Sequence, residues 1–312
     1  MSRDAMAMIE IEGLRKEYRR VRGGRTVAVD GLDLSVPEGG VFGFLGPNGA
    51  GKTTTIRCLL GLVRPSSGRL SLLGADVGHS LPTVIGRVGS IVEAPAMFAR
   101  FSGRRNLEIL ALIHGEGGAA VDASLERVGL RDRAKDPVKA YSLGMKQRLA
   151  IAATLLRDPS LLILDEPANG LDPAGIVEVR ELLRSLGAEG RTIFVSSHIL
   201  SEVQQTADHV AIVAKGKLIK AGPVNEVLAT TGASGVIVKL TDLEAGRRAL
   251  ADAGIPATID GGEMRADVPA DQSERISRTL AQAGLYVTEL RPDTVDLETV
   301  FLELTKDQGV GD

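Results

Sequence analysis

The stretch from Gly46 to Thr54, GPNGAGKTT, constrains this chain more than any other part of its sequence. It matches the phosphate-binding pattern G-x-x-x-x-G-K-[ST], with Gly51, Lys52 and Thr53 at the last three fixed positions. Glycines allow the backbone to curl so that successive N–H groups face one anion. The lysine brings a positive charge to the outer phosphates, and the threonine hydroxyl is a ligand that magnesium accepts. The stretch therefore predicts a site for a nucleotide phosphate chain.

The residues on both sides give this loop the setting it needs. Val41–Leu45 is an apolar run typical of a buried strand, and Thr54–Leu62 shows the single apolar face of a helix. A helix that begins at the loop adds its N-terminal dipole to the attraction for phosphate. The residues that we expect to contact the nucleotide are Asn48, Gly49, Ala50, Gly51, Lys52, Thr53 and Thr54.

Two adjacent acids at the end of an apolar run form the second strong signal. Leu161–Leu164 is typical of a central strand, and Asp165 and Glu166 follow it directly. Ligands of open parallel sheets bind at the carboxyl ends of the strands. Asp165 can hold magnesium together with Thr53, and Glu166 can accept a proton from an attacking water. Two adjacent acids that end a buried strand would be costly without a cation. The alternative is a merely solvated strand end, which the phosphate loop elsewhere in the chain disfavours.

Other polar residues at the ends of expected elements are weaker signals. His198 follows the expected buried strand 192–197, and none of the other three histidines stands at such a site. Tyr18 precedes a basic turn and could stack on a purine ring or pack on the strand edge; spacing leaves both open. Ser142 and Gly144 stand at an expected helix start, either as an ordinary cap or as a second anion site.

Composition excludes several classes of protein. The chain has 37 basic and 40 acidic residues, a net charge of -3, no Trp and 3% aromatic residues, which disfavours a nucleic-acid partner. The single cysteine, Cys58, permits no internal disulfide and is expected to be a small core residue. No apolar run approaches the roughly 18 residues of a membrane span, and the start lacks a signal-peptide pattern. We therefore expect a cytoplasmic chain without a transmembrane segment of its own.

Two domains are expected from the 312 residues. Residues 1–228 carry all the motifs above, and helical stretches interrupt their strand pattern at about 94–158 as a possible small lobe. Residues 229–235 are typical of a linker. Strands and helices then alternate in the β-α-β-β-α-β order of a ferredoxin-like fold, and a short helix at 300–304 ends the pattern. The 229–312 lobe has no polar cluster that suggests chemistry, so we interpret it as a regulatory or assembly module.

Taken together, these motifs resemble the ATP-binding subunit of an ABC transporter, most of all the bacterial drug and peptide-antibiotic exporters of the bacitracin and daunorubicin resistance type. The resemblance covers nearly the whole chain and implies an α/β fold with a P-loop NTPase core, ATP and Mg²⁺ as cofactors, and ATP hydrolysis. In that family Gly46–Thr54 is Walker A, Leu161–Asp165 is Walker B, Glu166 is the catalytic glutamate, Ala168–Asp172 is the D-loop, His198 is the switch histidine and Tyr18 is the aromatic residue stacked on adenine.

Two positions depart from the family pattern. The usual LSGGQ signature is Tyr141-Ser142-Leu143-Gly144-Met145 here, which keeps the serine and one glycine that the family uses on phosphate. The lid glutamine is replaced by Glu93, whose carboxylate can meet magnesium directly or through water. Both departures are similar to those of the antibiotic-exporter branch. They put the rate of turnover in question. With Glu93 included, the residues expected to bind magnesium are Thr53, Asp165 and Glu93.

The resemblance also implies partners. Ser142 and Gly144 of a second copy, in a homodimer or pseudo-dimer, would close over the γ-phosphate. A membrane permease of about six spans, in two copies, would carry the cargo. Its docking surface is expected at residues 93–101, where Met97, Phe98 and Phe101 either form an apolar groove or pack the small lobe. An importer ATPase and a soluble regulatory ATPase without a transport role remain as alternatives.

Overall fold

The computed structural model describes residues 7–19, 23–92, 97–229, 234–269, 272–294 and 296–305. The chain divides into two compact units, one reaching to Val224 and the other beginning at Asn225. This division lies a few residues before the expected linker. A short helix, α8 (Val224–Ala229), begins at the division and ends where the linker was expected to start. Each unit has its own core and is described separately.

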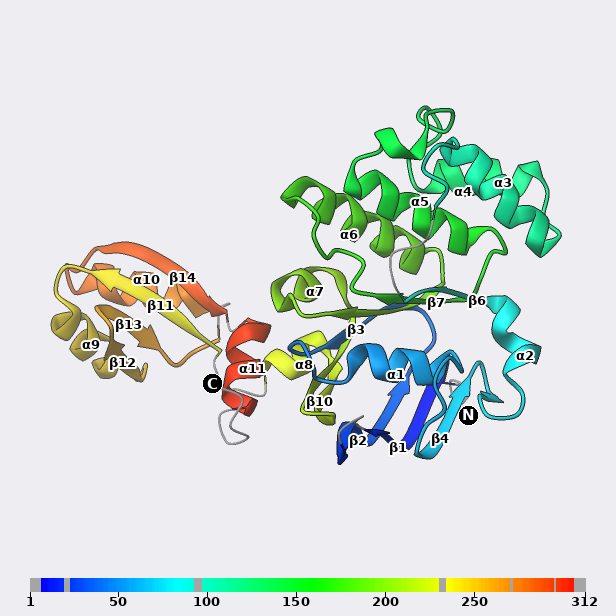
Figure 1. Ribbon diagram of the computed structural model, residues 1–312. Helices are drawn as coiled ribbons and strands as arrows, with labels where there is room; N and C mark the ends of the chain where they lie inside the picture. The colour runs from blue at the N-terminus through cyan, green and yellow to red at the C-terminus, as the bar shows by residue number, and fades with distance from the viewer. Residues whose placement is uncertain are drawn as a thin grey trace, which may run out of the picture. The chain divides into compact units, whose positions relative to one another are not determined.

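The first unit is built on a six-stranded sheet (Figure 1). Its strand order is β10-β9-β3-β8-β7-β6, and every neighbouring pair is parallel except β10 with β9. Parallel neighbours place the carboxyl ends of β3, β8 and β7 at one edge, where the polar residues of all three strands meet. The strands are β3 (Gly40–Leu45), β6 (Val88–Ile91), β7 (Leu161–Asp165), β8 (Thr192–Ser197), β9 (His209–Ala214) and β10 (Lys217–Pro223).

A second, antiparallel sheet lies on the far side of helix α1 (Lys52–Leu59) (Figure 1). Its strands, in the order β2-β1-β4-β5, are β2 (Arg25–Val36), β1 (Ile9–Arg19), β4 (Ser67–Leu72) and β5 (Ala75–Asp76). The apolar face of α1 packs in one cluster with both sheets, and Ile56 and Leu59 are fully buried. Cys58 is a buried core residue as expected, and burial raises the pKa of its thiol.

Helices cover the other face of the six-stranded sheet. The longer ones are α3 (Gly103–His114), α4 (Gly118–Arg127), α5 (Leu143–Leu155) and α6 (Pro173–Ala188), and the shorter α7 (Leu200–Thr206) lies with them. Helix α2 (Leu81–Val84) lies on the side of α1 instead, where Val84 is buried in one cluster with Ile56. The 3-10 turns of this unit are η1 (Ile85–Arg87) and η2 (Val138–Ala140). Leu107 of α3 and Leu149 of α5 share one buried cluster with Leu162 and Ile193 of the sheet. The helical stretches that the sequence suggested as a lobe therefore share their core with the sheet.

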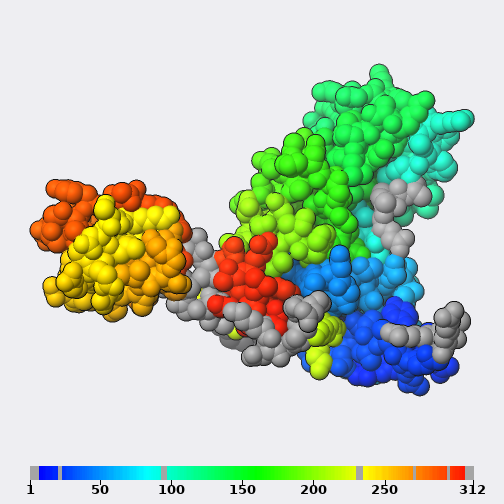
Figure 2. Space-filling view, turned by 60° about the vertical axis from the view of Figure 1, so that its left-hand side comes forward, coloured from blue at the N-terminus to red at the C-terminus, as the bar shows by residue number. Residues whose placement is uncertain are grey.

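The second unit has the expected alternation of elements. Its strands and helices are β11 (Ser234–Leu240), α9 (Leu243–Asp252), β12 (Ala257–Asp260), β13 (Glu263–Ala266), α10 (Ser273–Gln282), β14 (Val287–Thr294) and α11 (Leu297–Thr305), with α8 before them. The sheet order β12-β13-β11-β14 is antiparallel throughout, which is the split arrangement of the ferredoxin-like fold. Figure 2 shows residues 235–290, yellow to orange, as one closely packed body. Val238, Ile276 and Leu280 are fully buried in its core.

Charged side chains on the strands of this second sheet form a network. The ammonium of Lys239 lies 2.7 Å from a Glu263 carboxylate oxygen and 2.9 Å from one of Glu289. Arg291 bridges the same two acids at 3.0 and 2.8 Å. Hydrogen bonds from Lys239 are the main reason that the pKa values of both glutamates fall below the usual range, and the pKa of Lys239 rises in return. All four side chains stay partly exposed.

Most long elements lie where the sequence predicts them, and most differences concern short ones. The last helix, expected at 300–304, runs from Leu297 to Thr305. The sequence pattern did not indicate β5, α2, α7 and α8, because a few residues are too short to show a period. Helix α1 begins at Lys52, before the expected Thr54, so the lysine belongs to its first turn. None of the helices in the described residues is long and apolar enough to cross a membrane.

Candidate active site

The phosphate loop joins β3 to α1 in a shape that demands glycine. Gly49 and Gly51 have φ angles of 82° and 101°, a left-handed backbone that other residues rarely adopt. A Cβ on Gly51 would lie 2.5 Å from the carbonyl oxygen of Ala28, and one on Gly46 only 2.2 Å from that of Val213. The loop is therefore pressed between β2 and β9, and the sequence pattern reflects this steric limit as well as anion binding.

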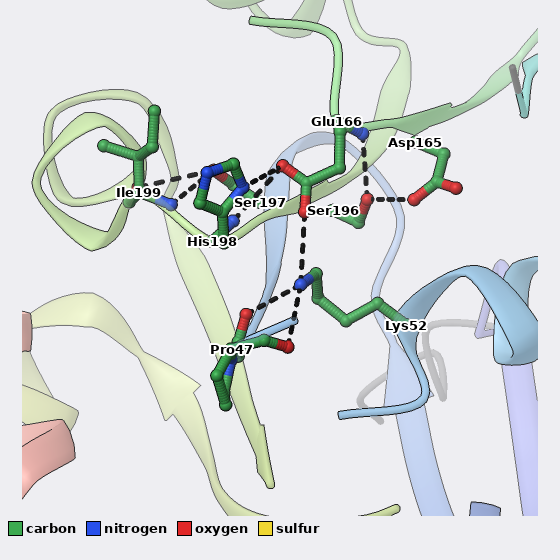
Figure 3. A network of polar contacts seen from close by, with 9 residues as sticks. Pro47, Lys52, Asp165, Glu166, Ser196, Ser197, His198 and Ile199 are labelled. Carbon is green, nitrogen blue, oxygen red and sulfur yellow. Dashed lines mark hydrogen bonds and ion pairs between the residues drawn. The ribbon is translucent and has the colours of Figure 1, made fainter. Parts of the chain in front are cut away.

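Lys52 points into the mouth of this loop (Figure 3). Its side chain is only 6% exposed, and the ammonium donates to the carbonyl oxygens of Gly46 at 2.7 Å and Pro47 at 3.3 Å. The same ammonium lies 3.1 Å from Oε1 of Glu166. A buried ammonium needs such partners, because desolvation disfavours its charge. Lys52 thus links the loop to the acidic pair across the sheet edge.

The acidic pair occupies the tip of β7 (Figure 3). Asp165 ends the strand, and Glu166 follows in a left-handed conformation with φ of 49°. Oε2 of Glu166 lies 2.7 Å from Nδ1 of His198 and accepts the backbone N–H of His198 at 3.3 Å. The structure therefore brings four residues from three separate motifs together at one edge of the sheet: Lys52, Asp165, Glu166 and His198.

A magnesium ion with a nucleotide fits the donors at this edge. The described residues hold no group of three or more His, Cys, Asp or Glu side chains suited to a metal. Magnesium does not need one, since it usually takes one or two carboxylates together with waters and substrate phosphates. Asp165 offers a carboxylate, and Thr53 offers a hydroxyl from the first turn of α1. Both are hard oxygen ligands, and a bound ion there would neutralise phosphate charge.

Tyr18 lies on the long hairpin beside the loop. It pairs in register with Thr26 of β2, close along that strand to Ala28, whose carbonyl presses on Gly51. Its side chain is 38% exposed, and the Lys16 ammonium lies 5.0 Å from the centre of its ring. The ring is therefore available at the surface rather than packed into the core.

Ser142 and Gly144 lie at the start of α5. Ser142 is the N-cap, and its hydroxyl accepts the N–H of Met145 at 3.2 Å, so the expected cap is present. The preceding Tyr141 is buried, donates its hydroxyl to the carbonyl of Arg133 at 2.7 Å, and has its pKa raised by burial. Within the described residues, no hydrogen bond or ion pair joins Ser142 or Gly144 to Lys52 or Glu166.

Comparison with known proteins decides the family. A sequence model described as "ABC transporter" matches residues 29–169. The bacitracin transport ATP-binding protein BcrA of Enterococcus faecalis is 36% identical over 97% of this chain and 98% of its own length. This chain is an ATPase of the ABC transporter family. The daunorubicin resistance ATP-binding protein DrrA3 of Streptomyces coeruleorubidus is 38% identical over 96% of both chains. BcrA of Bacillus licheniformis is 50% identical over 65% of this chain and 67% of its own.

A solved structure supports the same fold for this ABC ATPase. The structure of cbiO1 from Clostridium perfringens, part of the ABC transporter complex cbiONQ, has a TM-score of 0.62 and 28% identity. The match covers 72% of this chain and 92% of the solved one. The P-loop NTPase fold expected from the sequence is therefore confirmed.

The expected permease-facing segment of the ABC ATPase is only partly described, and Glu93 lies outside the described residues. Met97 packs against the core of the first unit, whereas Phe98 and Phe101 are 58% and 44% exposed. Their ring centres are 5.4 Å apart. The buried Asn106 fixes this segment by accepting the Phe98 N–H at 2.8 Å and donating to its carbonyl at 3.2 Å. The two phenylalanines thus form a small exposed aromatic pair.

The sequence reasoning did not single out Ser196, which the structure places between the two acids. Its hydroxyl lies 2.5 Å from Oδ1 of Asp165 and 2.9 Å from the backbone nitrogen of Glu166. One signal could have indicated it: a small polar residue near the end of a buried strand, two positions before His198.

Proposed function

We propose that this chain supplies the energy for export of a drug, an antibiotic or a lipid-like compound through a separate membrane permease. The observation that carries the proposal is the meeting of Lys52, Glu166 and His198 at the strand ends. The choice of export rests on the relatives: BcrA and DrrA3, named for bacitracin transport and daunorubicin resistance, align over nearly the full chain and so include the second unit.

Each residue of the cluster has a chemical task in this proposal. Lys52 exchanges part of its contact with carbonyls and Glu166 for the outer phosphates of ATP, where a point charge stabilises the transferred phosphoryl group. Thr53, Asp165 and Glu93 would hold Mg²⁺, which would neutralise phosphate charge. Glu166 accepts a proton from the attacking water. His198 orients that carboxylate from the other side, through its ring nitrogen and its backbone N–H.

ATP contacts complete the site from further elements. The backbone from Asn48 to Thr54 surrounds the phosphates, and Tyr18 stacks on adenine from its half-exposed position on the hairpin. Ser142 and Gly144 have no contact with the cluster within the described part of their own chain. They act in a homodimer or pseudo-dimer, in which each copy presents its α5 N-terminus to the nucleotide of the other.

The permease partner, of about six spans and in two copies, docks on the exposed pair Phe98 and Phe101 at the cytoplasmic face of the membrane. The 229–312 lobe assists assembly or regulation. Co-purification of the chain with a multi-span membrane protein supports transport. A chain that hydrolyses ATP but purifies with no membrane protein favours the soluble regulatory alternative, and loss of uptake in a deletion strain favours the importer.

Replacement of Glu166 by Gln tests the chemistry. The amide keeps the shape but cannot take a proton, so ATPase activity falls about 10²–10⁴-fold. ATP binding, measured by calorimetry, is retained. Glu126→Gln, on an exposed side chain of α4 paired with Arg131, is the matched control and leaves both quantities unchanged. Full ATPase activity in Glu166→Gln would remove Glu166 from its role.

A further inference from the structure

Ser196 carries a fully buried hydroxyl near the carboxyl end of β8. Its neighbours along the strand are Val195 and Ser197, and its relative exposure is 0%. In the sheet register it lies opposite Asp165 of β7 on one side and Phe44 of β3 on the other. Burying a hydroxyl costs free energy unless its hydrogen bonds are satisfied, so its partners at this position have consequences for the site.

The partners of Ser196 are the two functional acids (Figure 3). The Glu166 N–H can only donate, so the Ser196 oxygen accepts from it at 2.9 Å. An ionised carboxylate can only accept, so the Ser196 O–H donates to Oδ1 of Asp165 at 2.5 Å. One hydroxyl therefore fixes an oxygen of the expected magnesium ligand and the backbone of the expected base. The second oxygen of Asp165 points away from Ser196 (Figure 3).

The backbone of Glu166 is strained and depends on its hydrogen bonds to Ser196. Its φ of 49° is unfavourable for a residue with a Cβ, and such conformations persist where surrounding contacts enforce them. The Glu166 N–H meets the carbonyl oxygen of Ser196 at 3.2 Å as well as its hydroxyl. The side chain is held separately, by Lys52 and His198. Ser196 thus positions the backbone of Glu166, whereas Lys52 and His198 orient its carboxylate.

We propose that Ser196 is a positioning residue that sets Asp165 and Glu166 relative to each other, so that metal ligation and proton acceptance are coupled through one hydroxyl. This inference rests on the proposed function of the two acids. It predicts that loss of the hydroxyl weakens the magnesium-dependent part of nucleotide binding together with catalysis, while binding of metal-free nucleotide is unaffected. Loss of a residue that only stabilises the sheet would not weaken Mg²⁺-dependent binding while leaving metal-free binding unchanged.

The test compares Ser196→Thr with Ser196→Val, which have nearly the same shape and differ in the hydroxyl. Calorimetry measures the affinity of each full-length variant for a non-hydrolysable ATP analogue, once with Mg²⁺ and once with EDTA. Loss of such an outer-shell bond typically costs 10–100-fold in metal affinity or activity. We expect the gain in affinity that Mg²⁺ brings to be about 10-fold smaller in Ser196→Val than in the wild type. Its kcat should be about 10–100-fold lower. Ser196→Thr stays within about threefold of the wild type.

Thr192→Val is the control on the same strand. Thr192 is also fully buried, and its hydroxyl accepts the Gly39 N–H at 2.7 Å at the opposite end of β8. It therefore loses a comparable buried hydrogen bond without touching either acid, and its Mg²⁺ dependence remains that of the wild type. Ser196→Ala repeats the test if circular dichroism shows that valine disturbs folding.

The inference is overturned if Ser196→Val and Ser196→Thr bind the Mg²⁺–analogue complex equally, or if Thr192→Val shows the same loss as Ser196→Val. Failure of the proposed roles of Asp165 and Glu166 gives a different result, because the wild type would then show no Mg²⁺-dependent nucleotide binding at all. A wild type that binds, with Glu166→Gln inactive and Ser196→Val normal, removes only the role of Ser196.

Discussion

Each unit of this ABC ATPase contains a lysine that joins separate strands or loops through ion pairs, but the two lysines have opposite surroundings. Lys52 is 6% exposed and contacts one carboxylate and two carbonyls. Lys239 is 39% exposed and contacts two carboxylates that Arg291 also bridges. In the second unit every charge of the network is matched within it. In the first unit a buried ammonium and a strained glutamate face an edge that can admit an anion. Burial and backbone strain, rather than the number of ion pairs, distinguish the candidate active site from the exposed network.

The largest expected difference between the two lysines is in nucleotide affinity. Lys52→Met removes the charge at the phosphate loop, and charge-assisted hydrogen bonds contribute about 1.5–3 kcal/mol each. ATP affinity therefore falls about 10–100-fold. Lys239→Met leaves affinity unchanged. Calorimetric titration of both variants with Mg²⁺ and ATP checks the pair, and equal affinities would mean that the buried lysine has no role in binding.

An intermediate effect is expected from two glycines with similar left-handed backbones. Gly51→Ala costs about 2 kcal/mol or more of local stability, because the new Cβ meets both an unfavourable φ and the Ala28 carbonyl. Gly254 has φ of 70° after helix α9 and open space around it, so Gly254→Ala costs about 1 kcal/mol. Hydrogen exchange of amides in α1 and α9 reports each unit separately. Similar losses at the two sites would show that the phosphate loop can relax.

The smallest effect is expected from the exposed network, and it depends on pH. The pKa values of Glu263 and Glu289 are lowered, first of all by hydrogen bonds from Lys239. A lowered pKa means that the stabilisation is present above the usual value near 4.5 and is lost as pH falls through the folded value. Lys239→Met therefore lowers the melting temperature by no more than a few degrees at pH 7. That difference shrinks as pH falls from 5 towards 3, and a difference that grew on acidification would contradict the assignment.

Much of the first unit could be predicted from the sequence because its signals are local. The glycine loop, the acids after Leu164 and the cap at Ser142 each depend on a few consecutive residues, and the structure has the expected element at each place. The alternation from β11 to β14 in the second unit was also visible in the sequence, whereas the short helix α8 was not. These features carry their own backbone requirements in the sequence.

Contacts across strands could not be predicted in the same way. The bond of Ser196 to Asp165 depends on β8 lying beside β7 in one register, which no short pattern encodes. The common core of Leu107 and Leu162 is likewise set by tertiary packing, since periodicity shows which face of a helix is apolar but not what covers it. The surface positions of Phe98 and Phe101 were left open for the same reason. What the sequence missed is therefore mainly long-range pairing.

The left-handed backbone at Glu166 has a consequence for how this chain can be improved by selection or engineering. Glycine would relax that conformation, and so would asparagine to a lesser extent, so a screen for heat resistance alone favours replacements that end turnover in the proposed mechanism. We therefore expect a screen to keep Glu166 only when it also selects for ATPase activity. Consensus stabilisation of this enzyme should accordingly hold position 166 fixed and seek its gains elsewhere.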